Sequence, residues 1–159
     1  LESKGISNYL VEVGGELRAK GKKEDDSYWI VGIEQPEENN ADGVSLNNIL
    51  IKIKEKSLAT SGNYKKFYIE DGKKYAHIIN PFTGYPAMHN LLSATVIAGN
   101  CMTADAYATA FMVMGLDKAK QFLTDNKNLG LEVLFIYDEK GNSKTYMSKG
   151  FEENVEVQQ

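Results

Sequence analysis

A turn bracketed by two prolines constrains the middle of this chain more than any other feature. In the segment 80–86 the pairs Asn-Pro, Thr-Gly and Tyr-Pro follow one another closely, and Pro81 and Pro86 are two of the three prolines in the whole sequence. The residues before the turn, 73–79, favour a strand, and the apolar run 91–98 after it favours another. The chain must therefore reverse direction sharply between two strands at this point.

A helix signal follows the second of these strands. Thr103 is expected to cap the helix, which then runs to about Met114 and is stopped by Gly115. Asp105 falls in its first turn, and Thr109 comes four residues later, so both side chains share one helix face. A second helix is predicted over 117–125.

The remaining segments are mostly strand-like. Strands are predicted over 8–20, interrupted by Gly14-Gly15, and over 28–34, 49–54, 65–70, 73–79, 131–137 and 144–147. The pair Asp71-Gly72 predicts a hairpin, 58–64 reads as a small-residue turn, and a frayed polar tail is expected from Phe151. This order predicts an α+β domain, with an antiparallel β-rich core and two helices after the central strands.

We expect residues 1–150 to form one folded unit and residues 151–159 a polar tail. Residues 1–5 read as the last turn of a helix that begins before Leu1, with Gly5 as its C-terminal stop. That interpretation makes the chain a fragment of a larger domain.

Composition excludes several classes of protein. Hydrophobic residues make up 42% of the 159 residues and charged residues 25%, as in ordinary globular domains. A net charge of -4 offers no overall attraction to nucleic acid, and no apolar run reaches the roughly 18–20 residues of a transmembrane helix. The lone Cys101 excludes an internal disulfide and a multi-cysteine metal site.

Asp105 and Thr109 allow two interpretations. A carboxylate in a first helical turn is stabilised by the helix dipole, and a helical threonine can bond back to a carbonyl one turn earlier, so each could be purely structural. Together, a carboxylate and a hydroxyl one turn apart are hard oxygen ligands of the kind that Mg²⁺ accepts beside phosphate and water. The residues alone thus predict a domain that could hold phosphate and Mg²⁺.

Three other features have the same double interpretation. His77 could be a satisfied side chain at a strand end or a general base before the proline turn. Gly14-Gly15 could form a β-bulge or allow the close backbone approach of a ligand. The hydroxyls and Gly62 within 58–64 could line a ligand or simply make a turn.

Four ordered motifs carry a resemblance to a known family. They are Val13-Gly14-Gly15-Glu16, Thr60-Ser61-Gly62-Asn63-Tyr64, the pattern His-x-x-x-Pro-x-Thr-Gly-x-Pro from His77, and Thr-Ala-Asp-Ala-x-Ala-Thr from Thr103. Together, over residues 1 to about 147, they resemble the ApbE family of flavin transferases, which implies an ApbE-like, T-fold-like domain. The resemblance implies Mg²⁺-dependent transfer of FMN from FAD to a threonine or serine hydroxyl of an acceptor flavoprotein, a covalent flavinylation.

The resemblance also implies roles for individual residues. Asp105 and Thr109 would bind Mg²⁺, and His77 would lie beside the diphosphate of FAD and deprotonate the acceptor hydroxyl. Thr83 and Gly84 would shape the turn that holds His77. The FAD pocket would be lined by Gly14, Gly15, Glu16, Ser61 and Gly62.

Two departures from the family pattern stand out. Asn80 occupies a position where the family usually has Asp, which removes a negative charge beside His77. Members of the family are also about twice as long, and a segment before Leu1 would supply a further metal ligand, which leaves open whether the fragment alone is active. The resemblance implies a bacterial periplasmic or lipoprotein location. FAD hydrolysis to FMN and AMP, and a non-catalytic flavin-binding module, remain as alternatives.

Overall fold

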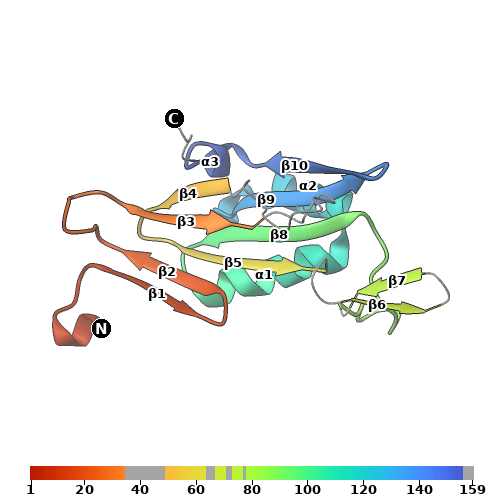
Figure 1. The fold of residues 1–159 in the computed structure, drawn as a ribbon, viewed down its shortest axis with the longest axis horizontal. Helices are drawn as coiled ribbons and strands as arrows, with labels where there is room; N and C mark the ends of the chain where they lie inside the picture. The colour runs from red at the N-terminus through yellow and green to blue at the C-terminus, as the bar shows by residue number, and fades with distance from the viewer. Residues whose placement is uncertain (35–48, 64–66, 71–72, 77, 156–159) are drawn as a thin grey trace, which may run out of the picture.

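The computed structural model describes residues 1–34, 49–63, 67–70, 73–76 and 78–155. A six-stranded sheet forms its centre, with neighbouring strands antiparallel throughout (Figure 1). In spatial order its strands are β1 (Tyr9–Val13), β2 (Glu16–Lys20), β5 (Ser57–Gly62), β8 (Leu91–Ala98), β9 (Glu132–Glu139) and β10 (Asn142–Met147). Two further antiparallel pairs lie beside it, namely β3 (Trp29–Ile33) with β4 (Ile49–Ile53), and β6 (Phe67–Glu70) with β7 (Lys73–Ala76).

Helices complete the described part of the chain. They are α1 (Cys101–Met114), α2 (Leu116–Asp125) and α3 (Lys149–Glu152), with short 3₁₀ turns at η1 (Glu2–Lys4) and η2 (Lys127–Leu129). Gly5 ends η1 in the left-handed conformation, and the amide of Gly115 bonds to the Phe111 carbonyl at the end of α1. The predicted α+β class, with two consecutive helices after the central strands, is therefore confirmed. None of the helices among these described residues is long and apolar enough to cross a membrane.

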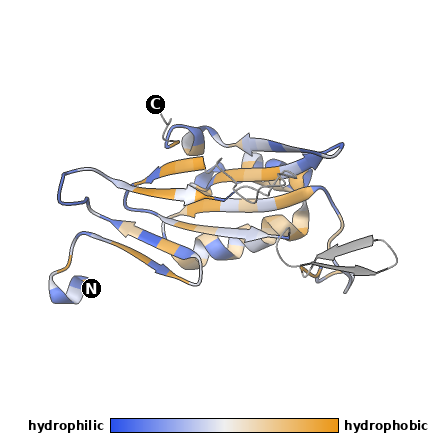
Figure 2. Cartoon of the chain, in the orientation of Figure 1, coloured by the Kyte–Doolittle hydropathy of each residue, from blue (hydrophilic) through white to orange (hydrophobic). Residues whose placement is uncertain are grey.

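The sheet is covered on both faces, so its strands alternate between two cores. Ala94 and Val96 of β8 pack with α1 and α2, whereas Ile97 packs with the ribbon formed by β3 and β4. Figure 2 shows apolar residues along β4, β8 and β9, as expected for strands that contribute to a core. The helix-side core is rich in alanine, which lets α1 lie close to β5.

The structure corrects four local predictions. Gly14-Gly15 is not a bulge but a two-residue hairpin turn between β1 and β2, with Val13 opposite Glu16. Residues 58–62 are not a turn but part of β5, because β8 supplies a full set of backbone partners. The proposed cap Thr103 lies inside α1, which begins two residues earlier, at Cys101.

The fourth correction concerns the end of the chain. Phe151 is fully buried in α3, and Val155 forms a bridge with Ile51 of β4. The prediction of a frayed tail from Phe151 is therefore wrong for residues 151–155. Most residues of this segment are polar, but the buried ring of Phe151 holds it against the core. The paired strands β6 and β7 agree with the predicted hairpin, although its turn, Asp71-Gly72, lies outside the described residues.

Candidate functional site

A cleft opens where β2 and β5 separate. The two strands pair through Leu17 with Leu58 and Arg18 with Ser57, and β2 then ends at the glycine turn while β5 continues to Gly62. The resulting cleft has a volume of about 890 Å³. It is lined by residues from β1, β2, β3, β5 and α1, together with Ile78 and Ile79. Seven of the ten candidate residues line it, namely Gly14, Gly15, Glu16, Ser61, Gly62, Asp105 and Thr109.

The glycine turn forms one rim of the cleft. Both residues have positive φ, 69° at Gly14 and 106° at Gly15, which is the requirement of a two-residue hairpin turn with primed geometry. A Cβ built on Gly15 would meet nothing within 4 Å, so backbone conformation rather than crowding requires glycine there. The turn also leaves bare backbone facing the cleft, so the structural and ligand-binding interpretations of this motif are compatible.

Helix α1 contributes the carboxylate and the hydroxyl. Its cap is Asn100, whose side-chain oxygen accepts a hydrogen bond from the Thr103 amide at 2.9 Å. Asp105 is therefore the fifth residue of the helix. The helix dipole favours acidic side chains in the first turn, and Asp105 lies beyond that turn. Among the described residues, none forms a hydrogen bond or ion pair with the Asp105 carboxylate, which is exposed to the cleft. The purely structural explanation of Asp105 is thereby weakened.

Thr109 reaches across to β5. Its Oγ1 lies 2.9 Å from the Oγ of Ser61, and either oxygen can donate. Ser61 and Ala59 share the helix-facing side of β5, where Ala59 packs in the same core as Ala104 and Ala108. These three small side chains let the helix come within hydrogen-bonding distance of the strand.

The described lining of the cleft is acidic. It includes the carboxylates of Glu12, Glu16 and Asp105, and no lysine or arginine occurs among the described lining residues. An anionic ligand would be repelled here unless a cation accompanied it. The described residues contain no cluster of three or more His, Cys, Asp or Glu side chains able to hold a metal by themselves. The site therefore fits a hard cation held by one carboxylate, one hydroxyl and oxygens of its ligand, the usual pattern for Mg²⁺.

The proline turn stands beside the cleft rather than in its lining. Asn80 organises it, since its side-chain oxygen accepts from the Phe82 amide at 2.9 Å and its backbone oxygen accepts from the Gly84 amide at 2.9 Å. Thr83 Oγ1 accepts from the Tyr85 amide at 3.3 Å, and Gly84 has φ 73°. Thr83 and Gly84 thus shape the turn but are not among the lining residues. His77 lies outside the described residues.

Sequence reasoning missed part of the lining. Glu12, residues 31–33 of β3 and the adjoining Glu34 contribute one wall of the cleft, although nothing in their local sequence distinguishes them from ordinary strand residues. The other histidine, His89, is structural. Its Nδ1 accepts from the Leu91 amide at 3.2 Å, which places the ring proton on Nε2, 2.6 Å from the Met112 carbonyl near the end of α1.

Comparison with known proteins places these features in a family. The model of the ApbE family matches residues 1–135. This chain belongs to the ApbE family. Over 151 residues it is 40% identical to proteins named FAD:protein FMN transferase from Vibrio cholerae and from Escherichia coli K12, and the match covers 95% of this chain. The four motifs of the sequence therefore do mark an ApbE protein.

Solved structures agree. The flavin transferase ApbE from Vibrio cholerae matches 97% of this chain with a TM-score of 0.81 and 38% identity. The apo form of the Pseudomonas stutzeri flavinyl transferase ApbE matches 96% of it with a TM-score of 0.80 and 32% identity. The chain spans only 41–43% of the two curated relatives and 45–46% of these two ApbE structures.

Proposed function

We propose that the protein containing this chain transfers FMN from FAD to a serine or threonine hydroxyl of an acceptor protein in a Mg²⁺-dependent reaction. One observation carries the proposal. A single cleft brings together the glycine turn, Ser61, Gly62, Asp105 and Thr109, which are remote in sequence, in a member of a family whose relatives are named FAD:protein FMN transferases.

The charge of the cleft supports a need for the metal. The diphosphate of FAD is anionic, and the described lining provides the carboxylates of Glu12, Glu16 and Asp105 but no lysine or arginine. Asp105 and Thr109 would hold the ion at the wall formed by α1. When bound, Mg²⁺ would neutralise the diphosphate and polarise the phosphorus that is attacked.

The protein's other residues would bind and orient FAD. The Gly14-Gly15 turn has no side chains, so the substrate can lie directly against its backbone. Leu17, Val31 and Leu58 supply apolar lining suited to a flat aromatic ring. Because rates of phosphoryl transfer depend mainly on positioning and charge neutralisation, such a cleft provides most of what the reaction needs.

The proposed step is a displacement at phosphorus. The acceptor hydroxyl oxygen forms a bond to the phosphorus of the FMN half of FAD, the bond from that phosphorus to the bridging oxygen breaks, and AMP leaves. The hydroxyl proton passes to the imidazole of His77, a role taken from the family resemblance. The products are an FMN phosphoester on the acceptor and AMP.

The test uses the natural full-length gene product that contains these 159 residues, called the full-length protein below. Incubated with FAD, Mg²⁺ and a candidate acceptor, it should add the mass of FMN to the acceptor and release AMP. A chelator should stop the reaction, and His77→Ala should slow it by about 10²–10⁴-fold, the usual contribution of a general base. Undiminished labelling with the chelator present would contradict the proposed metal dependence.

A second candidate is FAD hydrolysis with water as the nucleophile. It is favoured by the exposure of Asp105 and Thr109 to an open cleft that water can enter. Free FMN and AMP without a labelled acceptor would support it, and FAD binding with no products would indicate a non-catalytic module. We also propose a periplasmic or lipoprotein location from the family resemblance, which cell fractionation would test.

A further inference from the structure

We infer that Ser61 is a positioning residue for the metal ligand Thr109, rather than a direct contact to FAD. The inference rests on the proposed function for the identity of the metal and its substrate. Its geometric basis is the 2.9 Å contact between the two hydroxyl oxygens, one on β5 and the other on α1.

The chemistry of a hydroxyl ligand explains why a partner is needed. A threonine hydroxyl has two lone pairs and one proton, and a lone pair can face a cation only if the proton points elsewhere. An acceptor on the far side of the oxygen from the ion holds the proton there. Ser61 Oγ is within range to accept it, and a bound cation would strengthen this bond by polarising the Thr109 hydroxyl.

A threonine hydroxyl in a helix commonly donates to a carbonyl of the same helix, and a second threonine shows this arrangement. Thr124 in α2 donates to the Lys120 carbonyl one turn earlier, at 3.0 Å. Among the described residues, the hydroxyl of Thr109 bonds instead to the hydroxyl of Ser61 on the neighbouring strand. Its hydroxyl is thus directed by tertiary structure, so its orientation depends on a residue 48 positions away in the sequence.

The packing around this pair makes the arrangement reproducible. Ala59 precedes Ser61 on the same face of β5, and both Ala104 and Ala108 are fully buried beside it on α1. The backbone pairing of Ser61 with Ala94 of β8 then fixes the strand. Neither oxygen has to order a flexible loop to reach the other, so the oxygen of Thr109 is held in place before any ion arrives.

The test measures metal affinity as well as turnover. Mn²⁺, whose free form is visible by electron paramagnetic resonance, is titrated into the full-length protein with bound FAD, and chromatography verifies that FAD stays intact. Ser61→Ala should weaken Mn²⁺ binding by about 10–100-fold, as the loss of other groups that orient metal ligands does. Ser61→Thr keeps a hydroxyl on the strand and should restore most of the affinity. Thr124→Ala removes a helical hydroxyl outside the cleft and serves as the control.

Kinetics separates this role from a direct contact with FAD. Ser61→Ala should raise the Mg²⁺ concentration needed for half-maximal transfer while leaving the rate at saturating Mg²⁺ close to normal, and FAD affinity without metal should not change. Unchanged Mn²⁺ affinity in Ser61→Ala, or a loss of FAD affinity in the absence of metal, would overturn the inference. If the unaltered protein neither binds Mn²⁺ with FAD nor transfers FMN, the proposed function itself fails.

Discussion

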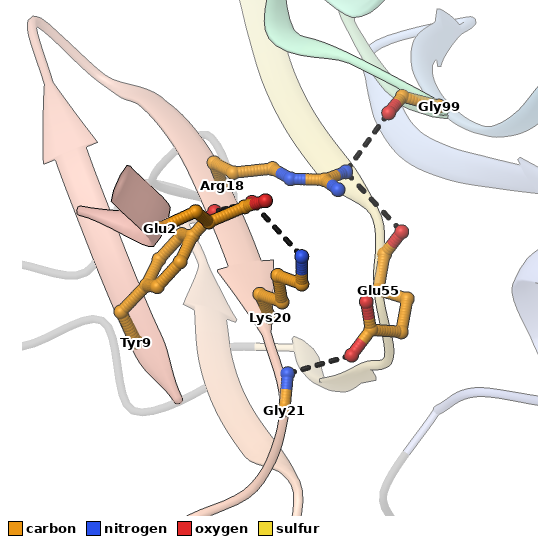
Figure 3. A network of polar contacts seen from close by, with 7 residues as sticks. All are labelled: Glu2, Tyr9, Arg18, Lys20, Gly21, Glu55 and Gly99. Carbon is orange, nitrogen blue, oxygen red and sulfur yellow. Dashed lines mark hydrogen bonds and ion pairs between the residues drawn. The ribbon is translucent and has the colours of Figure 1, made fainter. Parts of the chain in front are cut away.

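Polar side chains behave differently at the two ends of the junction between β2 and β5: they bond to other protein groups at one end and face the cleft at the other. At the closed end, around Arg18, the strands are paired and polar groups bond to the protein. Arg18 donates to the carbonyls of Gly99 at 2.8 Å and Glu55 at 3.2 Å, and the Glu55 carboxylate accepts from the Gly21 amide (Figure 3). At the open end the strands have separated, and the carboxylate of Asp105 has no partner among the described residues.

The contrast teaches that one helix can serve both ends. The start of α1 is tied to β2, since Gly99 accepts from Arg18 and the Cys101 thiol donates to the Leu17 carbonyl at 3.3 Å. One turn later the same helix presents Asp105 to the cleft. We therefore expect changes at the closed end to affect mainly stability, and changes at the open end to affect mainly metal binding and turnover.

The largest effect is expected at Asp105. Asp105→Asn keeps the size of the side chain but removes the proposed metal ligand's charge, so FMN transfer should fall on the order of 10³-fold. Because the carboxylate is exposed, the free energy of unfolding should change by no more than about 0.5 kcal/mol. Transfer assays and urea denaturation of the full-length protein measure the two effects.

Asp117→Asn is the matched control, because Asp117 is an exposed carboxylate in α2 outside the cleft. It should leave transfer unchanged. Full activity in Asp105→Asn would remove this residue from the site, whereas a collapsed fold would return it to a structural role.

The next effect is expected at the closed end. Arg18→Met keeps the apolar stem but removes both bonds to the Gly99 and Glu55 carbonyls, which should destabilise the fold by about 1–3 kcal/mol. Lys20→Met, on the same strand, removes a partly exposed ion pair with Glu2 and should cost much less. Urea midpoints rank the variants. Loss of transfer by folded Arg18→Met, without loss of stability, would contradict the proposed division of roles.

The glycine turn offers a finer comparison within the open end. Asn-Gly is the favoured pair for this turn, so Gly14→Asn should change stability by no more than about 0.5 kcal/mol. Gly15→Ala puts a side chain at φ 106° and should cost about 1–2 kcal/mol. If FAD lies against this backbone, Gly14→Asn should weaken FAD binding despite its normal stability. Equal stability of the two variants in thermal denaturation would contradict the assigned turn geometry.

The smallest effect concerns pH. Hydrogen bonds from Lys20 and then Tyr9 hold the pKa of Glu2 below its ordinary value of 4.5, and the bond to Glu2 raises the pKa of Lys20 above 10.5. The Glu2 contribution to stability is complete above pH 4.5 and is lost as pH falls through the lowered value. The Lys20 contribution is complete below pH 10.5 and is lost as pH rises through the raised value.

Glu2→Gln should therefore lower the urea midpoint slightly at pH 7, and the difference from the unaltered protein should be smaller at an acidic pH below the lowered pKa of Glu2. The effect is small because Glu2 is solvent-exposed and Lys20 is partly exposed. A difference of equal size at both pH values would show that charge is not its source.

Local signals in the sequence determined several features of this protein. The spacing of Asp105 and Thr109 places them on one face of any helix, and the apolar run 91–98 is the strand β8 with the predicted bounds. Gly115 stops α1 as expected. These features depend on residues within one or two turns, so neighbouring side chains decide them. The family motifs belong here too, because they are read from residue types alone.

Only the tertiary structure decided how these pieces form a site. Ser61 belongs to a strand because β8 pairs with it and α1 packs on it. Its small, polar neighbours in the sequence had instead predicted a turn. The wall contributed by β3 and the burial of Phe151 had no local signal, since distant segments supply the covering surface. The predicted cap was Thr103 rather than Asn100; Cys101 and Met102, which follow Asn100, lack the polar character that usually opens a helix. Local propensities amount to tenths of a kcal/mol per residue, whereas strand pairing and burial contribute more and come from residues far away in the chain.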